Sequence, residues 1–131
     1  MQELTIRTER RTQLVDITGP VREAVNGSEG AAALVYVPHT TAGVTINEHA
    51  DPAVARDFEA ALEKIVAEGW AWQHVEDGEE NAPSHVRAAL MGPQVLVPLR
   101  DGELALGTWQ GIFLCEFDGP RTRSVYVTVL Q

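Results

Sequence analysis

The sequence contains one cysteine, Cys115, among its 131 residues. A disulfide needs two cysteines, so none can form within the chain, and we expect a reducing compartment, the cytoplasm. Cys115 follows the apolar residues 112–114. This setting favours a small buried core residue over the alternative of a catalytic thiol.

Long apolar runs and basic runs are also missing. No stretch approaches the roughly 20 apolar residues of a membrane span, and residues 1–11 are polar and charged, so we expect neither a membrane segment nor a targeting segment. The formal net charge is -9. Nucleic acids and anionic membranes bind clustered Lys and Arg, so we expect neither as a partner. A small anionic substrate would need a few local arginines or a metal.

The length and composition fit one globular domain over residues 1–131. Hydrophobic residues make up 44% of the chain and charged residues 22%, which is ordinary for a folded protein. A chain of this length typically buries roughly two thirds of its unfolded surface. It can therefore build a core without disulfides.

The first part of the chain predicts strands around a short helix. Strands are expected over residues 4–7 and 14–18, a helix over 20–25 and a short strand over 43–46. Residues 31–37 form a nearly continuous apolar run, typical of a central strand buried on both faces.

The clearest helix begins at Asp51, whose carboxylate suits the N-cap, followed by Pro52 at the first helical position. We favour this capping role for Asp51 over catalysis. Gly69 marks the expected end. The apolar side chains predicted to share one face of this helix are Val54, Phe58, Leu62, Ile65 and Val66.

The second part predicts a polar loop, another helix and two hairpins. The loop covers residues 73–82 and the helix 83–91. The hairpins are expected as strands 95–99 and 103–106 around turn 100–102, and strands 109–117 and 124–130 around 118–121. Strands at both ends with helices between them indicate the α+β class.

Three histidines lie where a strand or helix meets a loop: His39, His74 and His85. If they converge, their imidazoles would suit zinc or a similar divalent ion with an open position for water or substrate. No motif fixes that geometry, and three unrelated surface histidines remain the alternative.

Each of the other polar residues is open to two interpretations. Asn47 and Glu48 are either turn residues or part of a site. Glu116 alternates with the apolar residues of its strand, so it either faces water or enters a polar cavity with a raised pKa. Arg87 and Arg121 are candidate phosphate ligands or solvated surface residues.

Trp109 has a similar ambiguity. Its indole could stack on a planar ring of a substrate, or it could serve core packing or an oligomer contact.

The order of motifs resembles the YjbQ-like family over essentially the whole chain. The matching stretches are HTTAGVTINE at 39–48, ADP at 50–52, His74 with Glu76 and Gly78, PSHVR at 83–87, GELALGTWQGI at 102–112 and EFDGPR at 116–121.

The resemblance implies an α+β fold with a curved mixed sheet enclosing two or three helices, assembled as a homotrimer. It implies a polar site that carries His39, His74 and His85, lined by Asn47, Glu48 and Glu116. The family is often labelled a secondary thiamine-phosphate synthase, which describes a weak side activity. Two residues depart from the family pattern: His49 where Asn is usual, and Arg87 where Lys is usual. An Arg at position 87 is still suited to phosphate binding, but it argues against a role that needs a deprotonated amine there.

The leading hypothesis is an enzyme that acts on a small phosphorylated metabolite through a divalent metal, expected to be zinc, on His39, His74 and His85. Glu48 and Glu116, with Asn47, would form the catalytic group. The residues assigned to substrate binding are Thr40, Thr41, Arg87, Trp109, Gln110 and Arg121. A metal-dependent hydrolase of another substrate and a non-enzymatic trimeric module that binds a ligand or metal remain open.

Overall fold

A computed structural model describes residues 1–75 and 80–131. Glu76 and Gly78 of the family motif, and the rest of the segment 76–79, lie outside the described residues. Within the described part of the chain, no helix is long and apolar enough to cross a bilayer.

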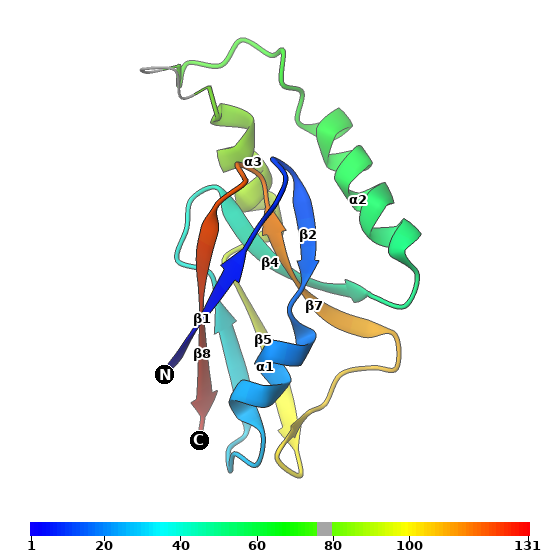
Figure 1. The fold of residues 1–131 in the computed structure, drawn as a ribbon, viewed down its shortest axis with the longest axis vertical. Coiled ribbons are helices and arrows are strands. Elements are labelled where there is room, and N and C mark those ends of the chain that lie inside the picture. Colours follow the sequence, from blue (N-terminus) through cyan, green and yellow to red (C-terminus); the bar gives the residue numbers. More distant parts are fainter. Residues whose placement is uncertain (76–79) are drawn as a thin grey trace.

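The described residues form eight strands and three helices (Figure 1). In chain order they are β1 (Gln2–Arg7), β2 (Gln13–Asp16), α1 (Thr18–Val25), β3 (Ala32–Tyr36), β4 (Ala42–Glu48), α2 (Pro52–Ile65), α3 (Ala82–Met91), β5 (Gln94–Arg100), β6 (Glu103–Leu104), β7 (Gln110–Glu116) and β8 (Thr122–Leu130).

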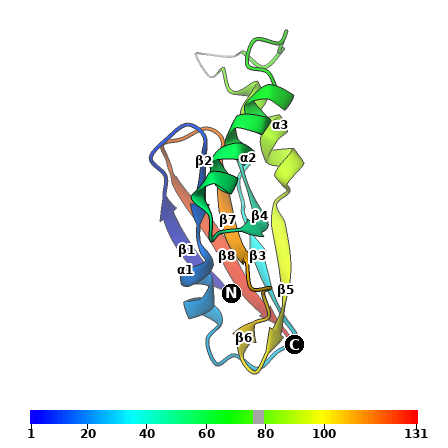
Figure 2. The same ribbon diagram turned by 90° about the vertical axis from the view of Figure 1, so that its right-hand side faces the viewer.

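The strands make two sheets, ordered β1-β8-β3-β5-β6 and β2-β7-β4. They adjoin where Val44 N of β4 donates to Gly92 O, just before β5, at 3.0 Å. Figure 2 shows the sheets curling around a common interior, with α2 and α3 outside the smaller one. The α+β prediction is therefore confirmed as a curled sheet with helices. Every described pairing is antiparallel, so the mixed sheet implied by the resemblance is corrected to an antiparallel one.

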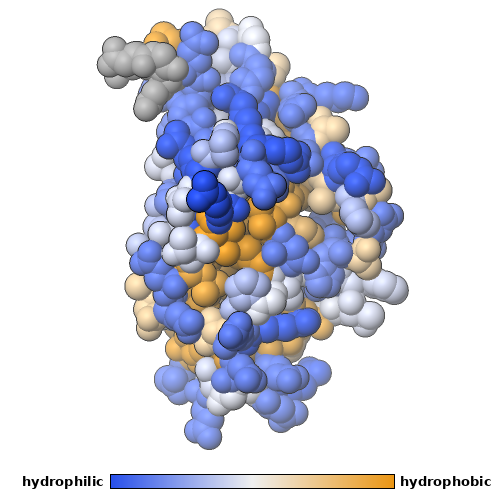
Figure 3. Space-filling model, in the orientation of Figure 1, coloured by the Kyte–Doolittle hydropathy of each residue, from blue (hydrophilic) through white to orange (hydrophobic). Residues whose placement is uncertain are grey.

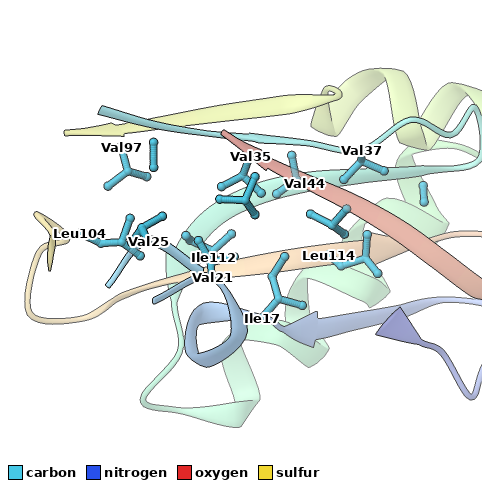
Figure 4. Packing of buried hydrophobic residues seen from close by; sticks show 14 residues of the cluster. Ile17, Val21, Val25, Val35, Val37, Val44, Val97, Leu104, Ile112 and Leu114 are labelled. Atoms are coloured by element: carbon cyan, nitrogen blue, oxygen red, sulfur yellow. The ribbon is translucent and has the colours of Figure 1, made fainter. Parts of the chain in front are cut away.

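The main core lies between the two sheets and α1. Val21 of α1 lies beside Ile112 of β7, and Val25 lies beside Leu104 (Figure 4). At the opposite side from the β4–β5 junction, the larger sheet ends at β1 and the smaller one at β2. These two edge strands are not paired with each other. Figure 3 shows hydrophobic side chains near the centre of this face, flanked by hydrophilic ones.

The strand buried on both faces is β7, and the prediction for residues 31–37 was wrong in this respect. In β3, Ala33 and Val35 are buried whereas Tyr36 is exposed. The side chains of β3 therefore alternate between the core and the outer face of the sheet. β7 is covered by the large sheet on one face and by α2 and α3 on the other.

The predicted hairpin around residues 118–121 is also corrected. β7 pairs with β2 and β4, whereas β8 pairs with β1 and β3. The segment 118–121 therefore crosses from one sheet to the other. The turn at 100–102 does join a hairpin of β5 and β6, with Asp101 and Gly102 at positive φ.

The helix α2 begins as predicted, because the Asp51 side chain accepts a hydrogen bond from Ala53 N at 2.9 Å and Pro52 follows it. It ends at Ile65, before Gly69. Leu62 and the C-cap Val66 are buried, but Ile65 is 70% exposed. The predicted apolar face is thus only partly covered within this chain.

Helix α3 lies close against β4 at Gly43. A Cβ at this position would stand 2.7 Å from Gly92 O and 3.1 Å from Met91 Cβ. Only glycine permits this approach without a shift of α3. The contact sets the position of the helix that carries His85.

Candidate functional site

The structure sorts the predicted site residues into three groups. One group surrounds the end of β7 at Glu116, a second lies at the start of α3, and a third lies at the junction of β4 with β7. Glu116 and Gln110 occupy opposite ends of β7. At about 3.3 Å per residue they are about 20 Å apart. The predicted residues therefore do not form one site within this chain.

Glu116 is fully buried and points inward with Ile112 and Leu114. Its carboxylate accepts hydrogen bonds from Arg123 Nε at 2.8 Å, from Thr8 Oγ1 at 2.7 Å, and from Arg123 Nη2. The backbone N–H groups of Phe117 and Asp118 donate to its Oε2, each at 3.1 Å. Its hydrogen-bonding positions are therefore filled by the protein.

The pKa of Glu116 is lowered, which corrects the raised-pKa alternative. Burial by itself would raise this pKa, but hydrogen bonds from Arg123, Thr8 and the Asp118 N–H outweigh it. Glu116 is thus held ionised as the partner of Arg123. Sequence reasoning did not single out Arg123, although it shares the inward parity of Val125 and Val127. The alternation of buried residues along β8 was therefore the sequence feature that could have identified Arg123.

His39 belongs to the same group. Its Nε2 accepts a hydrogen bond from Ser124 N at 2.9 Å. Burial and the nearby Arg123 guanidinium lower its pKa, so the neutral ring is favoured. Of the adjacent threonines, Thr41 is buried and its Oγ1 accepts from Arg123 Nη2 at 2.8 Å, whereas Thr40 is exposed. Thr41 therefore belongs to the buried hydrogen-bond network of Glu116 and Arg123.

The second group contains the other two predicted metal ligands. The rings of His74 and His85 lie edge to face, with centroids 5.1 Å apart. His74 borders two adjoining hollows of about 420 and 310 Å³, both of which Trp72 also lines. Among residues 1–75 and 80–131, no three His, Cys, Asp or Glu side chains form a group that could hold a metal. His74 and His85 therefore meet without His39.

The two predicted phosphate ligands have carboxylate partners. Arg87 is fully buried; it donates from Nη1 to Glu68 at 3.1 Å and from Nη2 to Val66 O at 2.6 Å. Arg121 is half-exposed; its Nη2 donates to the Asp118 carboxylate at 2.9 Å and its Nε donates to the Asp118 backbone oxygen at 2.8 Å.

Helix α3 also carries two buried polar atoms without a described partner. They are Arg87 Nε and Oδ1 of Asn81, the residue before α3. The Nδ2 group of Asn81 donates to Asp118 at 2.9 Å, the same carboxylate that binds Arg121. This shared carboxylate connects Arg121 to the start of the helix that carries His85.

The third group lies where β4 and β7 are paired. Asn47 and Glu48 are the last residues of β4 and are opposite Gly111 and Gln110. This corrects their placement in a turn. Asn47 Oδ1 accepts from the N–H of Glu48 at 2.7 Å, and Gln110 Oε1 accepts from Gly107 N at 2.8 Å.

Trp109 stands beside this group with 63% of its surface exposed. Its backbone oxygen accepts from His49 N at 3.0 Å. His49 in turn lies 2.8 Å from Asp16 Oδ2 through Nδ1. This Asp16–His49 pair was missed by sequence reasoning because 33 residues separate its members, and no local pattern links them.

Comparison with known proteins places this fold and sequence among related chains. The family model described as "UPF0047 protein YjbQ-like" matches residues 2–131. The UPF0047 protein YugU of Bacillus subtilis is 41% identical over 134 residues, covering 99% of this chain and 98% of that protein. A UPF0047 protein of Archaeoglobus fulgidus is 44% identical, covering 98% and 99%. The crystal structure of an uncharacterized conserved protein of this family from Clostridium acetobutylicum matches with a TM-score of 0.94 at 43% identity, covering 99% of this chain and 100% of that chain.

Proposed function

The chain belongs to the UPF0047 family of YjbQ-like proteins, and on that premise we propose that it is an enzyme that acts on a small phosphorylated metabolite with a divalent metal. The observation that carries this proposal is the contact between His74 and His85 beside two hollows. Catalytic zinc sites combine imidazole and other protein ligands with an open position for water or substrate.

The donor set fits a divalent ion in part. His74 and His85 supply two imidazoles, the ligand type that suits zinc. The remaining positions would be taken by water or substrate. A metal held there would supply polarisation of phosphate oxygens or activation of water.

The residues around the two histidines have roles that follow from their contacts. Trp72 lines both hollows and offers an apolar wall for a ring. Arg121, half-exposed and anchored by Asp118, keeps a positive charge at this end for a phosphate group.

The first reaction to test is the condensation of a pyrimidine diphosphate with a thiazole phosphate, as in thiamine-phosphate synthesis. Release of phosphate from other metabolites without condensation would instead favour a hydrolase. Metal binding without turnover on either substrate class would favour a binding module.

Assembly as a homotrimer is part of the same proposal. An apolar groove of about 590 Å³ runs between α2 and α3, and the exposed Ile65 and Leu90 line it. An exposed apolar groove of this kind is typical of a contact surface. Light scattering after size exclusion should give a trimer for the native chain and a smaller species for Leu90→Asp.

The decisive experiment measures metal in untagged, chelator-free protein by elemental mass spectrometry, together with turnover. We expect metal in the native chain, loss of both metal and turnover in His85→Ala, and retention in the surface control Glu103→Gln. His39→Ala tests whether His39 contributes from another subunit. Full metal content and full turnover in both His74→Ala and His85→Ala would refute the proposed site.

A further inference from the structure

A separate hollow of about 460 Å³ lies between β2, the end of β4 and the start of α2. Its lining includes Asp16, Glu48 and His49. Glu48 is the only one of these three that the sequence assigned to catalysis. The histidines of the proposed metal site line other hollows. The hollow beside His49 is therefore separate from that site.

The His49 ring is oriented by a carboxylate. Asp16 Oδ2 lies 2.8 Å from His49 Nδ1, and because a carboxylate only accepts, Nδ1 carries the proton. When the ring is neutral, its lone pair is therefore on Nε2. This is the arrangement in which an imidazole takes a proton from a reacting group, with the carboxylate stabilising the imidazolium that forms.

Asp16 is itself fixed by a chain of hydrogen bonds. Its Oδ1 accepts from the Thr18 N–H at 2.9 Å and from Thr18 Oγ1 at 2.6 Å. Thr18 Oγ1 accepts in turn from Ile112 N of β7 at 2.8 Å. The carboxylate is thus tied to the core of the smaller sheet.

The backbone of β7 makes room for the imidazole. A Cβ at Gly111 would overlap the His49 ring and stand 2.7 Å from His49 Cβ. The His49 N–H also donates to Trp109 O at 3.0 Å. Both the backbone and the ring of His49 are therefore held against β7.

The charges of the hollow restrict its ligand. Its walls carry four carboxylates, Asp16, Glu48, Asp51 and Glu59, against two guanidinium groups, Arg10 and Arg56. Arg10 is bound to Glu59 at 3.1 Å. An anionic substrate would be repelled by this balance, whereas a neutral or cationic one would not.

We propose that this hollow is a reactive site in which His49, positioned by Asp16, is the general base for hydrolysis of small neutral or cationic esters. His49 Nε2 takes a proton from water as the water oxygen bonds to the ester carbonyl carbon. The C–O bond to the alcohol then breaks, and Nε2 returns the proton to the leaving oxygen. Ester and water become acid and alcohol, with no further reactant. Arg56, on the same wall, supplies positive charge for the transient oxyanion.

The test measures hydrolysis of p-nitrophenyl acetate and acetylthiocholine by the full chain in the presence of EDTA, which removes any metal from the His74–His85 site. We expect a rate above that of imidazole at equal concentration. His49→Asn should lower kcat/KM about a hundredfold or more, the usual contribution of a general base. Asp16→Asn should lower kcat with little change in KM, and Asp101→Asn, in an exposed turn, is the matched control.

Two further measurements keep the result independent of folding. Thermal unfolding of each variant shows whether it is folded, and two-bond proton–nitrogen NMR reports the tautomer of His49. The proton should be on Nδ1 in the native chain, with the tautomer mixture shifting in Asp16→Asn. A native rate no higher than that of imidazole, or a folded His49→Asn with the native rate, would overturn the proposal. Metal-dependent turnover at His85 could survive either result.

Discussion

Glu116 Oε1 accepts a hydrogen bond from Arg123 Nε at 2.8 Å inside the protein, although the two residues belong to different sheets. Glu116 is the last residue of β7 and Arg123 is near the start of β8. Their ion pair therefore joins the two sheets beside the segment that crosses between them.

Replacing Glu116 by Gln should strongly destabilise the fold. The substitution leaves the Arg123 charge buried at 4% exposure without an ionised partner, and breaking a buried pair in this way costs about 3–5 kcal/mol. Urea unfolding at pH 7 measures the free-energy change. Glu103→Gln on the exposed edge should stay within about 0.5 kcal/mol. A loss below about 1 kcal/mol for Glu116→Gln would contradict the role of this pair.

The contribution of Glu116 should also depend on pH. Its pKa is lowered from 4.5 in the folded state, so below pH 4.5 the unfolded chain binds more protons than the folded chain. The stability that the ionised carboxylate contributes is complete above 4.5 and is lost as pH falls through the folded pKa. Urea unfolding from pH 7 to pH 3 should show a shrinking difference between native protein and Glu116→Gln. A difference that stays constant with pH would rule this out.

His39→Gln should flatten the pH dependence between pH 7 and 5. The folded pKa of His39 is lowered from 6.5, so below 6.5 the unfolded chain takes up the proton first and the native protein loses stability. Glutamine can still accept from Ser124 N through Oε1 but does not titrate. Thermal unfolding at several pH values checks this. If His39→Gln showed the same change of thermal stability with pH as the native protein, His39 would not be the source of that pH dependence.

Gly43→Ala should displace α3 and destabilise the protein. The added Cβ would stand 2.7 Å from Gly92 O, which is backbone and has little freedom to move. Overpacking of this kind costs about 1–3 kcal/mol. Gly69→Ala is the matched control, because no atom lies within 4 Å of its added Cβ. Equal unfolding free energies for the two variants would show that α3 adapts freely.

Cys115 should be unreactive until the protein unfolds. Burial raises the pKa of its thiol to about 12, so almost no thiolate is present at pH 8. Reaction with a chromogenic disulfide reagent should be slow in buffer and immediate in denaturing urea. Rapid reaction of the folded chain would mean that β7 opens easily.

Local features of the sequence determined the elements themselves. The Asp51–Pro52 pair located the start of α2, and the turn predicted at 100–102 located the β5–β6 hairpin. Each depends on backbone conformations and hydrogen bonds among residues a few positions apart. The burial of Cys115 was likewise predicted from its apolar neighbours and is confirmed. The motif order also identified the family.

Only the tertiary structure decided which elements meet. Propensity made β7 and β8 look like a hairpin, yet the edges available to each strand placed them in different sheets. That separation buries the Glu116–Arg123 pair between the sheets and turns His39 toward Ser124. Tertiary packing also places the His74 ring beside that of His85 and brings Asp16 to His49. These contacts join residues that are distant in the chain, and such contacts are set by how the whole core packs rather than by local sequence.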